Sequence, residues 1–155
     1  MLEKILQLLD DNQIHYRKLS HEPILTSEDS ARVRGEPLEI GGKAILMKIN
    51  QEFILFVLSA ARKIDSSAIK AQFKAKKLRF ATSDELWEKT GLVPGSVPPF
   101  GRPIMDFDLY VDESVTMLPR IAFNAGSLTD SVIMSIEDYF NLAQPTVFSF
   151  STLPE

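Results

Sequence analysis

The spacing of apolar and polar residues changes along the chain, from the pattern typical of a helix in some segments to that typical of a strand in others. Residues 2–12, "LEKILQLLDDN", place their leucines and isoleucine on one broad helical face, which predicts an amphipathic helix near the N-terminus. A short extended segment, "IHYRKL", is expected to follow it. The chain therefore starts with a helix that has one face to bury and a strand that leads away from it.

Four more helices are predicted by polar residues that can cap their first turns. Thr26 or Ser27 precedes residues 27–34, and Asp65 precedes residues that look helical up to Lys74. Thr82 and Glu85 have the spacing of a capping box, and the last helix, "IEDYFNLAQ", begins behind Ser135. Gly35 and Gly91 are predicted to end two of these helices in a left-handed conformation.

The extended segments predict a sheet. "KAILMKI" and "FILFVLS" flank the short polar connector "NQE", which indicates a hairpin whose second, almost wholly apolar strand is central and covered on both faces. Further strands are expected at "KLRFA", "IMDFDLYVD", "RIAFNAG" and "DSVIMS". Helices and strands are interspersed without regular βαβ repetition, so we expect a mixed α/β (α+β) domain with a strongly curved mixed sheet and helices packed around it.

Composition supports one ordinary globular domain. The chain has 155 residues, of which 45% are apolar and 25% charged, and we expect a single domain over residues 1–155. Cysteine is absent, which excludes disulfides and thiolate chemistry. The first residues lack the apolar core of a signal peptide and no stretch approaches a membrane span, so a cytoplasmic protein without membrane contact is expected.

The net charge of −4 argues against a strongly basic nucleic-acid binder, but one segment departs from it. "KAQFKAKKLR" contains Lys70, Lys74, Lys76 and Lys77 and no acidic residue. A solvated helix end explains this cluster without any function. Alternatively, clustered ammonium groups can hold a polyanion such as a tRNA backbone.

Several familiar chemistries are excluded. "GGKA" resembles a phosphate-binding loop, but Ala44 replaces the required Ser or Thr and Pro37 stands where its first glycine belongs. The two histidines, His15 and His21, have no metal-binding spacing, and no GxSxG motif is present. We therefore expect neither a metal nor a cofactor, and no covalent serine nucleophile.

Three features remain. Lys43 stands at the head of a strand, residues 91–101 form a loop stiffened by glycine and proline, and "FNAGS" forms a turn of small residues. Each has an ordinary structural explanation, which for Lys43 is a lysine whose stem covers apolar surface while its ammonium reaches water. Stiff loops can also hold backbone N–H groups at fixed positions around a ligand.

At these residues the chain resembles a known family. "HEPILTSED", "GGKAILMK", "GLVPGSVPPFG" and "FNAGSLTDSVIMS", in this order, are similar to the YbaK/EbsC family, the free-standing relatives of the editing domain in bacterial prolyl-tRNA synthetases. The resemblance covers roughly residues 1–145. It implies a mixed, barrel-like sheet surrounded by helices, and an aminoacyl-tRNA deacylase that removes a small amino acid such as alanine or cysteine from tRNA for proline or a related tRNA.

The resemblance also implies a site. Lys43 matches the essential lysine of the family and Thr26 its pocket threonine. The other residues expected to bind substrate come from the glycine/proline loop, the small-residue turn and the strand after it, namely Gly91, Gly95, Val97, Pro99, Phe100, Gly101, Asn124, Gly126 and Asp130. Asp130 is a candidate for holding the substrate's ammonium group. Lys43 is expected to meet either the ester carbonyl or a phosphate of the terminal adenosine, and the sequence leaves both open.

Two positions differ from the branch of the family that acts on cysteinyl-tRNA. Leu19 stands where that branch has a tyrosine, and Ser131 where it has a pocket aspartate. The chain looks closer to the branch that acts on alanyl-tRNA or other small misacylated residues. Because one methylene changes discrimination by only about 1–3 kcal/mol, single substitutions can change the substrate.

Three functions follow as alternatives. The first is trans-editing of misacylated tRNA, with an aminoacyl-tRNA synthetase as a further candidate partner. The second is a non-catalytic module that binds an aminoacyl group, a nucleotide or a synthetase. The third is a structural domain in which Lys43 is solvent-exposed and no cavity adjoins the loop. Residues 146–155 lie beyond the resemblance and are either an added strand or a contact for a partner.

Overall fold

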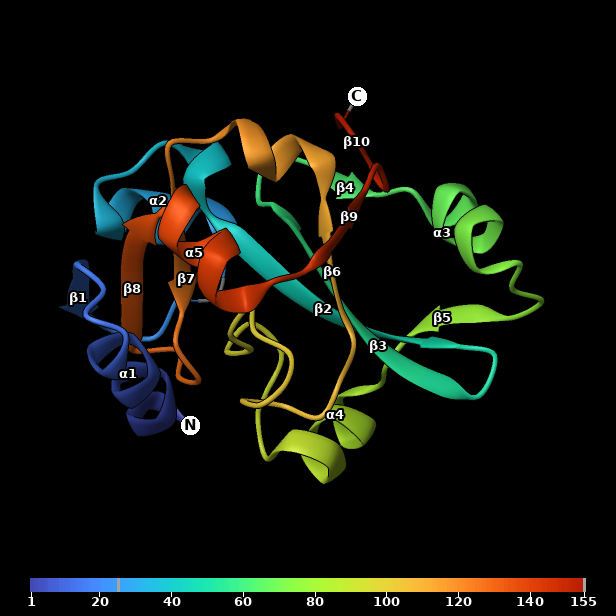
Figure 1. Ribbon diagram of the computed structural model, residues 1–155, viewed down its shortest axis with the longest axis horizontal. Helices are drawn as coiled ribbons and strands as arrows, with labels where there is room; N and C mark the ends of the chain where they lie inside the picture. Colours follow the sequence, from blue (N-terminus) through green and yellow to red (C-terminus); the bar gives the residue numbers. More distant parts are fainter. Residues whose placement is uncertain (25, 155) are drawn as a thin grey trace.

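The computed structural model describes residues 1–24 and 26–154 and has a mixed α/β architecture (Figure 1). The α-helices are α1 (Leu2–Asp11), α2 (Ser27–Arg34), α3 (Ser66–Phe73), α4 (Ser83–Thr90) and α5 (Ile136–Ala143), with short 3₁₀ turns η1 (Leu38–Ile40) and η2 (Glu113–Met117). The strands are β1 (Tyr16–Ser20), β2 (Gly42–Ile49), β3 (Glu52–Ser59), β4 (Lys63–Ile64), β5 (Leu78–Phe80), β6 (Leu109–Asp112), β7 (Arg120–Asn124), β8 (Asp130–Ser135), β9 (Thr146–Phe148) and β10 (Ser151–Thr152).

The strands form three sheets over the described residues. The largest is mixed, with the order β5-β2-β3-β6-β9, in which β6 lies parallel to both β3 and β9. The second, β1-β8-β7, is antiparallel, and β10 pairs with β4 in the third. The predicted hairpin and the central position of its second strand are confirmed. None of the three strand orders closes on itself in the described part of the chain, so the barrel-like expectation is not confirmed.

The predicted helix caps are confirmed by their hydrogen bonds. The hydroxyl of Thr26 accepts the N–H of Asp29, and Thr82 and Glu85 form the complete capping box. Asp65 and Ser135 cap α3 and α5 in the same way. Such caps are readable from sequence because they need only local chain geometry.

The strand predicted at residues 104–112 is wrong in its first half, because β6 begins only at Leu109. The N–H of Met105 donates to the carbonyl of Gly101, and the N–H of Phe107 donates to that of Met105. Both side chains are buried in the main core, so the alternating apolar pattern is produced by turns instead of a strand.

The C-terminal residues complete a second core. Phe150 is fully buried and its ring makes edge and tilted contacts with Phe56 and Phe148, next to Tyr110 and Phe73. Residues 146–152 therefore add strands to two sheets, which agrees with the added-strand alternative for this segment.

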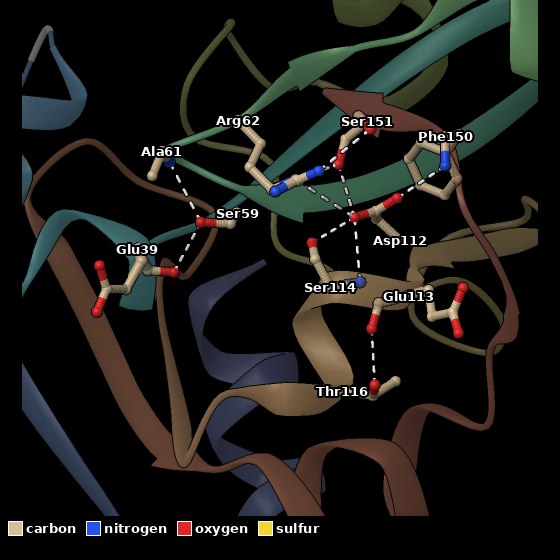
Figure 2. Close-up of polar contacts among 10 residues, drawn as sticks. All are labelled: Glu39, Ser59, Ala61, Arg62, Asp112, Glu113, Ser114, Thr116, Phe150 and Ser151. Carbon is tan, nitrogen blue, oxygen red and sulfur yellow. Dashed lines mark hydrogen bonds and ion pairs between the residues drawn. The ribbon is translucent and has the colours of Figure 1, made fainter. Parts of the chain in front are cut away.

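A buried aspartate attaches this segment to the rest of the molecule (Figure 2). Asp112 is 1% exposed and accepts hydrogen bonds from the N–H of Phe150 at 2.7 Å and the hydroxyl of Ser151 at 2.7 Å, as well as from Ser114. Arg62 lies 4.0 Å from the carboxylate and also donates to Ser151. Burial on its own would raise the pKa of Asp112, but these hydrogen bonds outweigh it and lower the pKa.

No helix in the described part of the chain combines the length and the apolar character needed to cross a membrane.

Candidate functional site

A cavity of about 240 Å³ lies where the five-stranded and three-stranded sheets meet. Its walls come from α2, the start of β2, the glycine/proline loop and β7. The lining residues are Ile24, Thr26, Ser27, Ser30, Ala31, Arg34, Glu36, Pro37, Leu38, Gly41, Gly42, Lys43, Ala44, Ile45, Ala60, Gly95, Val97, Ala122 and Asn124. The volume is slightly below the range of about 300–1,000 Å³ typical of small-molecule pockets, which favours a small ligand group.

The two glycines before Lys43 let the sheets approach each other. Gly41 forms an isolated parallel bridge with Ala122 of β7. A Cβ on Gly42 would lie 2.5 Å from the Cδ1 atom of Ile121, a side chain that is fully buried. Glycine at this position therefore brings β2 against β7 and places the next residue, Lys43, at the cavity.

Lys43 lines the cavity and is only partly exposed. Burial lowers the pKa of its ammonium group, and the nearby carboxylate of Glu28 opposes this shift. The third alternative, a solvent-exposed lysine with no adjoining cavity, is wrong, because Gly95 and Val97 of the glycine/proline loop line the same cavity.

One face of α2 forms a wall that the sequence analysis did not identify. Ser27, Ser30, Ala31 and Arg34 all line the cavity and are three or four positions apart, so they share one side of the helix. This spacing of small and polar residues was readable in the sequence. Nothing in it shows, however, that this side faces a cavity instead of solvent.

Arg34 is the charged member of these four residues, and it is buried, with 7% of its surface exposed. Its Nε donates to the hydroxyl of Ser131 at 3.0 Å and one terminal nitrogen donates to Oδ1 of Asn124 at 3.0 Å. The other terminal nitrogen lies 3.5 Å from the carbonyl of Ala122. Burial lowers the pKa of the guanidinium to about 10, so the group is still charged at neutral pH.

A hydrogen-bond chain connects Arg34 to the glycine/proline loop. Asn124, which accepts from Arg34, donates through Nδ2 to the carbonyl of Gly95 at 2.8 Å. On the other side, Ser131 lies 2.8 Å from Nε2 of His21. Nδ1 of His21 lies 2.9 Å from the carbonyl of Glu22, so Nδ1 carries a proton, and the hydroxyl of Ser131 donates to Oδ1 of Asn124 at 3.2 Å.

Glu36 also lines the cavity, but two arginines hold its carboxylate. Arg120 donates to it through Nε at 2.9 Å, and Arg17 lies at 3.7 Å. Among the described lining residues it is the single carboxylate, and it has no contact with Arg34. The cavity therefore carries two cations, Lys43 and Arg34, and one anion that is already neutralised.

The structure brings together five of the residues predicted to form the site. These are Thr26, Lys43, Gly95, Val97 and Asn124. Their roles stay predictions, but their common position shows that the strand head, the helix cap and the loop meet in one place.

The other predicted residues lie outside the cavity lining. Gly91 ends α4, and Phe100 is packed in the main core against Phe123 and Tyr139. The carbonyl of Pro99 accepts the Tyr139 hydroxyl at 2.7 Å, and Gly126 packs against Met1. In this half of the loop, side-chain packing and turn geometry account for the residues.

Gly101 and Asp130 are also placed elsewhere. Gly101 lines a second hollow of about 400 Å³ near Arg102 and Tyr110, and a Cβ there would lie 2.6 Å from the carbonyl of Phe107. Asp130 pairs with Lys18 at 3.4 Å and accepts from Ser20 and Thr129. Its neighbour Ser131 points toward Arg34 instead, because successive residues of a strand face opposite sides.

The four predicted tRNA-binding lysines are exposed in the segment from α3 to β5, and these two elements lie on the opposite side of the molecule from α2 and β7 (Figure 1). Lys70 and Lys74 belong to the end of α3, and the N–H groups of Lys76 and Lys77 donate to Asn50 at the β2–β3 turn. Asn50 follows Lys43 by seven positions, just past the end of β2, which corresponds to about 23 Å of strand. A ligand contacting both regions must be extended.

Among the described residues, no group of three His, Asp, Glu or Cys side chains could hold a metal ion.

Comparison with known proteins identifies relatives over most of the chain. Residues 21–142 match the family model of the aminoacyl-tRNA editing domain. The chain is 30% identical to the multifunctional Ser/Thr-tRNA deacylase ProXp-y of Escherichia coli K12, over 96% of this chain and 91% of that protein. It is 22% identical to the prolyl-tRNA editing protein ProX of Acetoanaerobium sticklandii, over 97% and 95% of the two chains.

Part of a larger enzyme is also similar. The chain is 26% identical to a region of the proline–tRNA ligase of Macrococcus caseolyticus, which covers 68% of this chain and 18% of that enzyme. Among solved structures, a protein provisionally described as a trans-editing enzyme for prolyl-tRNA synthetase matches with a TM-score of 0.83 and 19% identity, over 97% and 96% of the two chains. This last likeness establishes the fold.

Proposed function

The chain belongs to the aminoacyl-tRNA editing domain family, and from this we propose that it is a hydrolase that cleaves the ester bond of misacylated tRNA in trans. One observation carries the proposal, namely that Lys43 reaches the wall of a small cavity closed on another side by Gly95 and Val97. Such a cavity suits the aminoacyl group at a tRNA 3′ end. The relatives named as deacylase and editing proteins support the same reaction.

The proposed reaction adds water to the ester carbonyl and breaks the bond to the ribose oxygen. The ribose oxygen takes one proton of the water and leaves as a hydroxyl, and the amino acid leaves as a carboxylate with the second proton released to solvent. Lys43 stabilises the negative charge that develops on the carbonyl oxygen, a contribution worth roughly 3 kcal/mol for one oriented donor. Backbone amides of the glycine/proline loop assist it.

No side chain of the described lining is a free carboxylate or histidine, because Glu36 is held by arginines. We therefore propose that the substrate itself helps to activate the water, through its amino group or a neighbouring ribose hydroxyl. This arrangement is sufficient because an aminoacyl ester is already an activated bond.

We propose small aminoacyl groups, including those with a hydroxyl, as substrates. Thr26, Ser27 and Ser30 give the cavity hydroxyls, and Ala31, Ala44 and Ala122 keep it small. Alanine, serine, threonine and cysteine are then the candidates. Serine and threonine are supported by the name of the E. coli relative and by the polar lining.

The decisive experiment is a deacylation panel with tRNAs charged with alanine, serine, threonine, cysteine or proline. The purified protein should hydrolyse at least one of them, and Lys43→Ala should slow this about 100-fold or more, as for removal of an oxyanion donor. Lys48→Ala, on the same strand, is the matched control and should retain activity. Binding without turnover across the panel would favour the non-catalytic module, and full activity of Lys43→Ala would reject the role of Lys43.

We further propose that Lys70, Lys74, Lys76 and Lys77 contact the tRNA beyond its 3′ end. Their distance from Lys43 along β2 suits the acceptor stem better than the terminal adenosine. Replacing all four with glutamine should raise KM for the charged tRNA and flatten its salt dependence, and leave kcat nearly unchanged. An unchanged salt dependence would reject this contact.

We also propose that residues 1–155 act as one domain, with an aminoacyl-tRNA synthetase as a candidate partner. The similarity to part of a proline–tRNA ligase supports this partner class.

A further inference from the structure

Arg34 differs from every other arginine of the chain. The sequence has seven arginines, and six of them have a carboxylate oxygen within 4.0 Å: Arg17, Arg32, Arg62, Arg79, Arg102 and Arg120. Arg34 has no such partner among the described residues. Its hydrogen-bond acceptors, Ser131, Asn124 and the carbonyl of Ala122, are all neutral.

This isolation is combined with burial. Arg34 is 7% exposed, so its charge has lost most of its contact with water without gaining an anion from residues 1–24 or 26–154. A buried charge without a counter-ion is costly, and buried charges are normally paired or bind a ligand. The missing anion is therefore expected to come from outside the chain.

The guanidinium is also placed to meet a ligand. Arg34 lines the cavity from α2, and its Nη1 lies 3.7 Å from the position of a Cβ on Gly41, another lining residue. That nitrogen has the weakest of the three contacts, 3.5 Å to the Ala122 carbonyl. The carboxylate of Glu36, another lining residue, contacts Arg120 and Arg17, and no ion pair joins it to Arg34 among the described residues.

We propose that Arg34 forms an oxyanion-binding subsite in the cavity wall, separate from Lys43, that takes a carboxylate or a phosphate group. The inference rests on the proposed function for the source of this anion. Hydrolysis of a neutral ester produces an amino-acid carboxylate, and the terminal nucleotide carries a phosphate. A planar guanidinium recognises either group through parallel N–H donors.

Two pairs of probes distinguish these sources by direct binding to the purified protein, measured by titration calorimetry or NMR. Adenosine 5′-monophosphate is compared with adenosine, which lacks the phosphate. L-Serine is compared with serinol, in which an alcohol replaces the carboxylate. Each probe is titrated into the wild-type protein, into Arg34→Met and into the control Arg79→Met, whose arginine is already paired with Glu85.

In one of the two pairs, Arg34→Met should weaken binding of the anionic probe at least about 10-fold more than binding of its neutral analogue. This excess loss of affinity, the coupling between Arg34 and the anion, has the size expected for one charge-assisted hydrogen bond. Coupling to the monophosphate assigns the subsite to phosphate, and coupling to serine assigns it to carboxylate. Arg79→Met should show no coupling. If Arg34→Met does not fold, Arg34→Gln replaces it, because glutamine can still bond Ser131 and Asn124 without a charge.

Coupling below about 2-fold in both pairs, or no measurable binding of either anion to the wild-type protein, would overturn the subsite. Because binding is measured without turnover, this outcome is independent of the deacylation panel. Active deacylation without coupling would reject only the subsite, and coupling without deacylation would reject only the proposed reaction.

Discussion

Two buried charges with opposite surroundings lie in different parts of this molecule. Asp112 is 1% exposed and is surrounded by donors from Ser114, Phe150 and Ser151, with Arg62 beside it (Figure 2). Arg34 is 7% exposed and, within the described part of the chain, contacts neutral acceptors alone. The described residues supply donors and a counter-ion for the first charge, but no counter-ion for the second.

The difference separates a structural use of a buried charge from a ligand-binding one. The donors around Asp112 come from η2 and the C-terminal segment, so its charge holds these parts together. Arg34 borders a cavity, and the described groups around it include no counter-ion. We therefore expect changes at Asp112 to reduce stability and changes at Arg34 to affect binding.

Asp112→Ala should have the largest effect on stability. It leaves the N–H of Phe150 and the hydroxyl of Ser151 without their acceptor and Arg62 without its carboxylate, which should destabilise the fold by about 3 kcal/mol. For a chain of this size, this lowers Tm by roughly 6–12 °C. Thermal unfolding measures it, and the exposed Asp108→Ala is the control, with an expected change within about 0.5 kcal/mol.

The pH dependence of this effect has a definite sign. The folded-state pKa of Asp112 is below its ordinary value of 3.8, so its charge stabilises the fold above that value. This contribution is lost as pH falls through the folded-state pKa. The gap between wild type and Asp112→Ala should therefore narrow in acid, and a constant gap would contradict the lowered pKa.

Arg34→Met should change the free energy of unfolding much less, by within about 1 kcal/mol in urea denaturation. Replacing a buried charge by an apolar side chain removes a desolvation penalty, and Ser131 can still donate to Asn124. Arg62→Met is the matched arginine and should destabilise more, because it leaves Asp112 without its cation and Ser151 without its donor. Equal losses at the two arginines would remove the contrast between the regions.

Lys43→Met should have the smallest effect on stability and the opposite sign. The folded-state pKa of Lys43 is below the ordinary 10.5, so charging this group disfavours folding at neutral pH, and the penalty is relieved as pH rises toward 10.5. The variant should show a slightly higher Tm at pH 7, with the difference shrinking as pH rises. The exposed Lys63→Met should show no such gain, and a lower Tm for Lys43→Met would contradict the prediction.

The sequence by itself determined the local elements and the family. Caps at Thr26, Thr82 and Ser135, and the hairpin around "NQE", depend on residues a few positions apart, so their patterns identify them. The position of Lys43 at a strand head after two glycines was equally readable. The ordered motifs indicated the editing family, which the comparisons confirm.

The tertiary structure decided which of these residues share a cavity and which buried charges gain a partner of opposite charge. Arg34 and Ser131 are 97 positions apart, and Asp112 and Phe150 are 38 apart. Such contacts depend on strand order and on the packing of one sheet against another, for which no local pattern gives a signal. For the same reason the glycine/proline loop looked uniform in sequence, although Gly95 and Val97 line the cavity and Pro99 and Phe100 support the core.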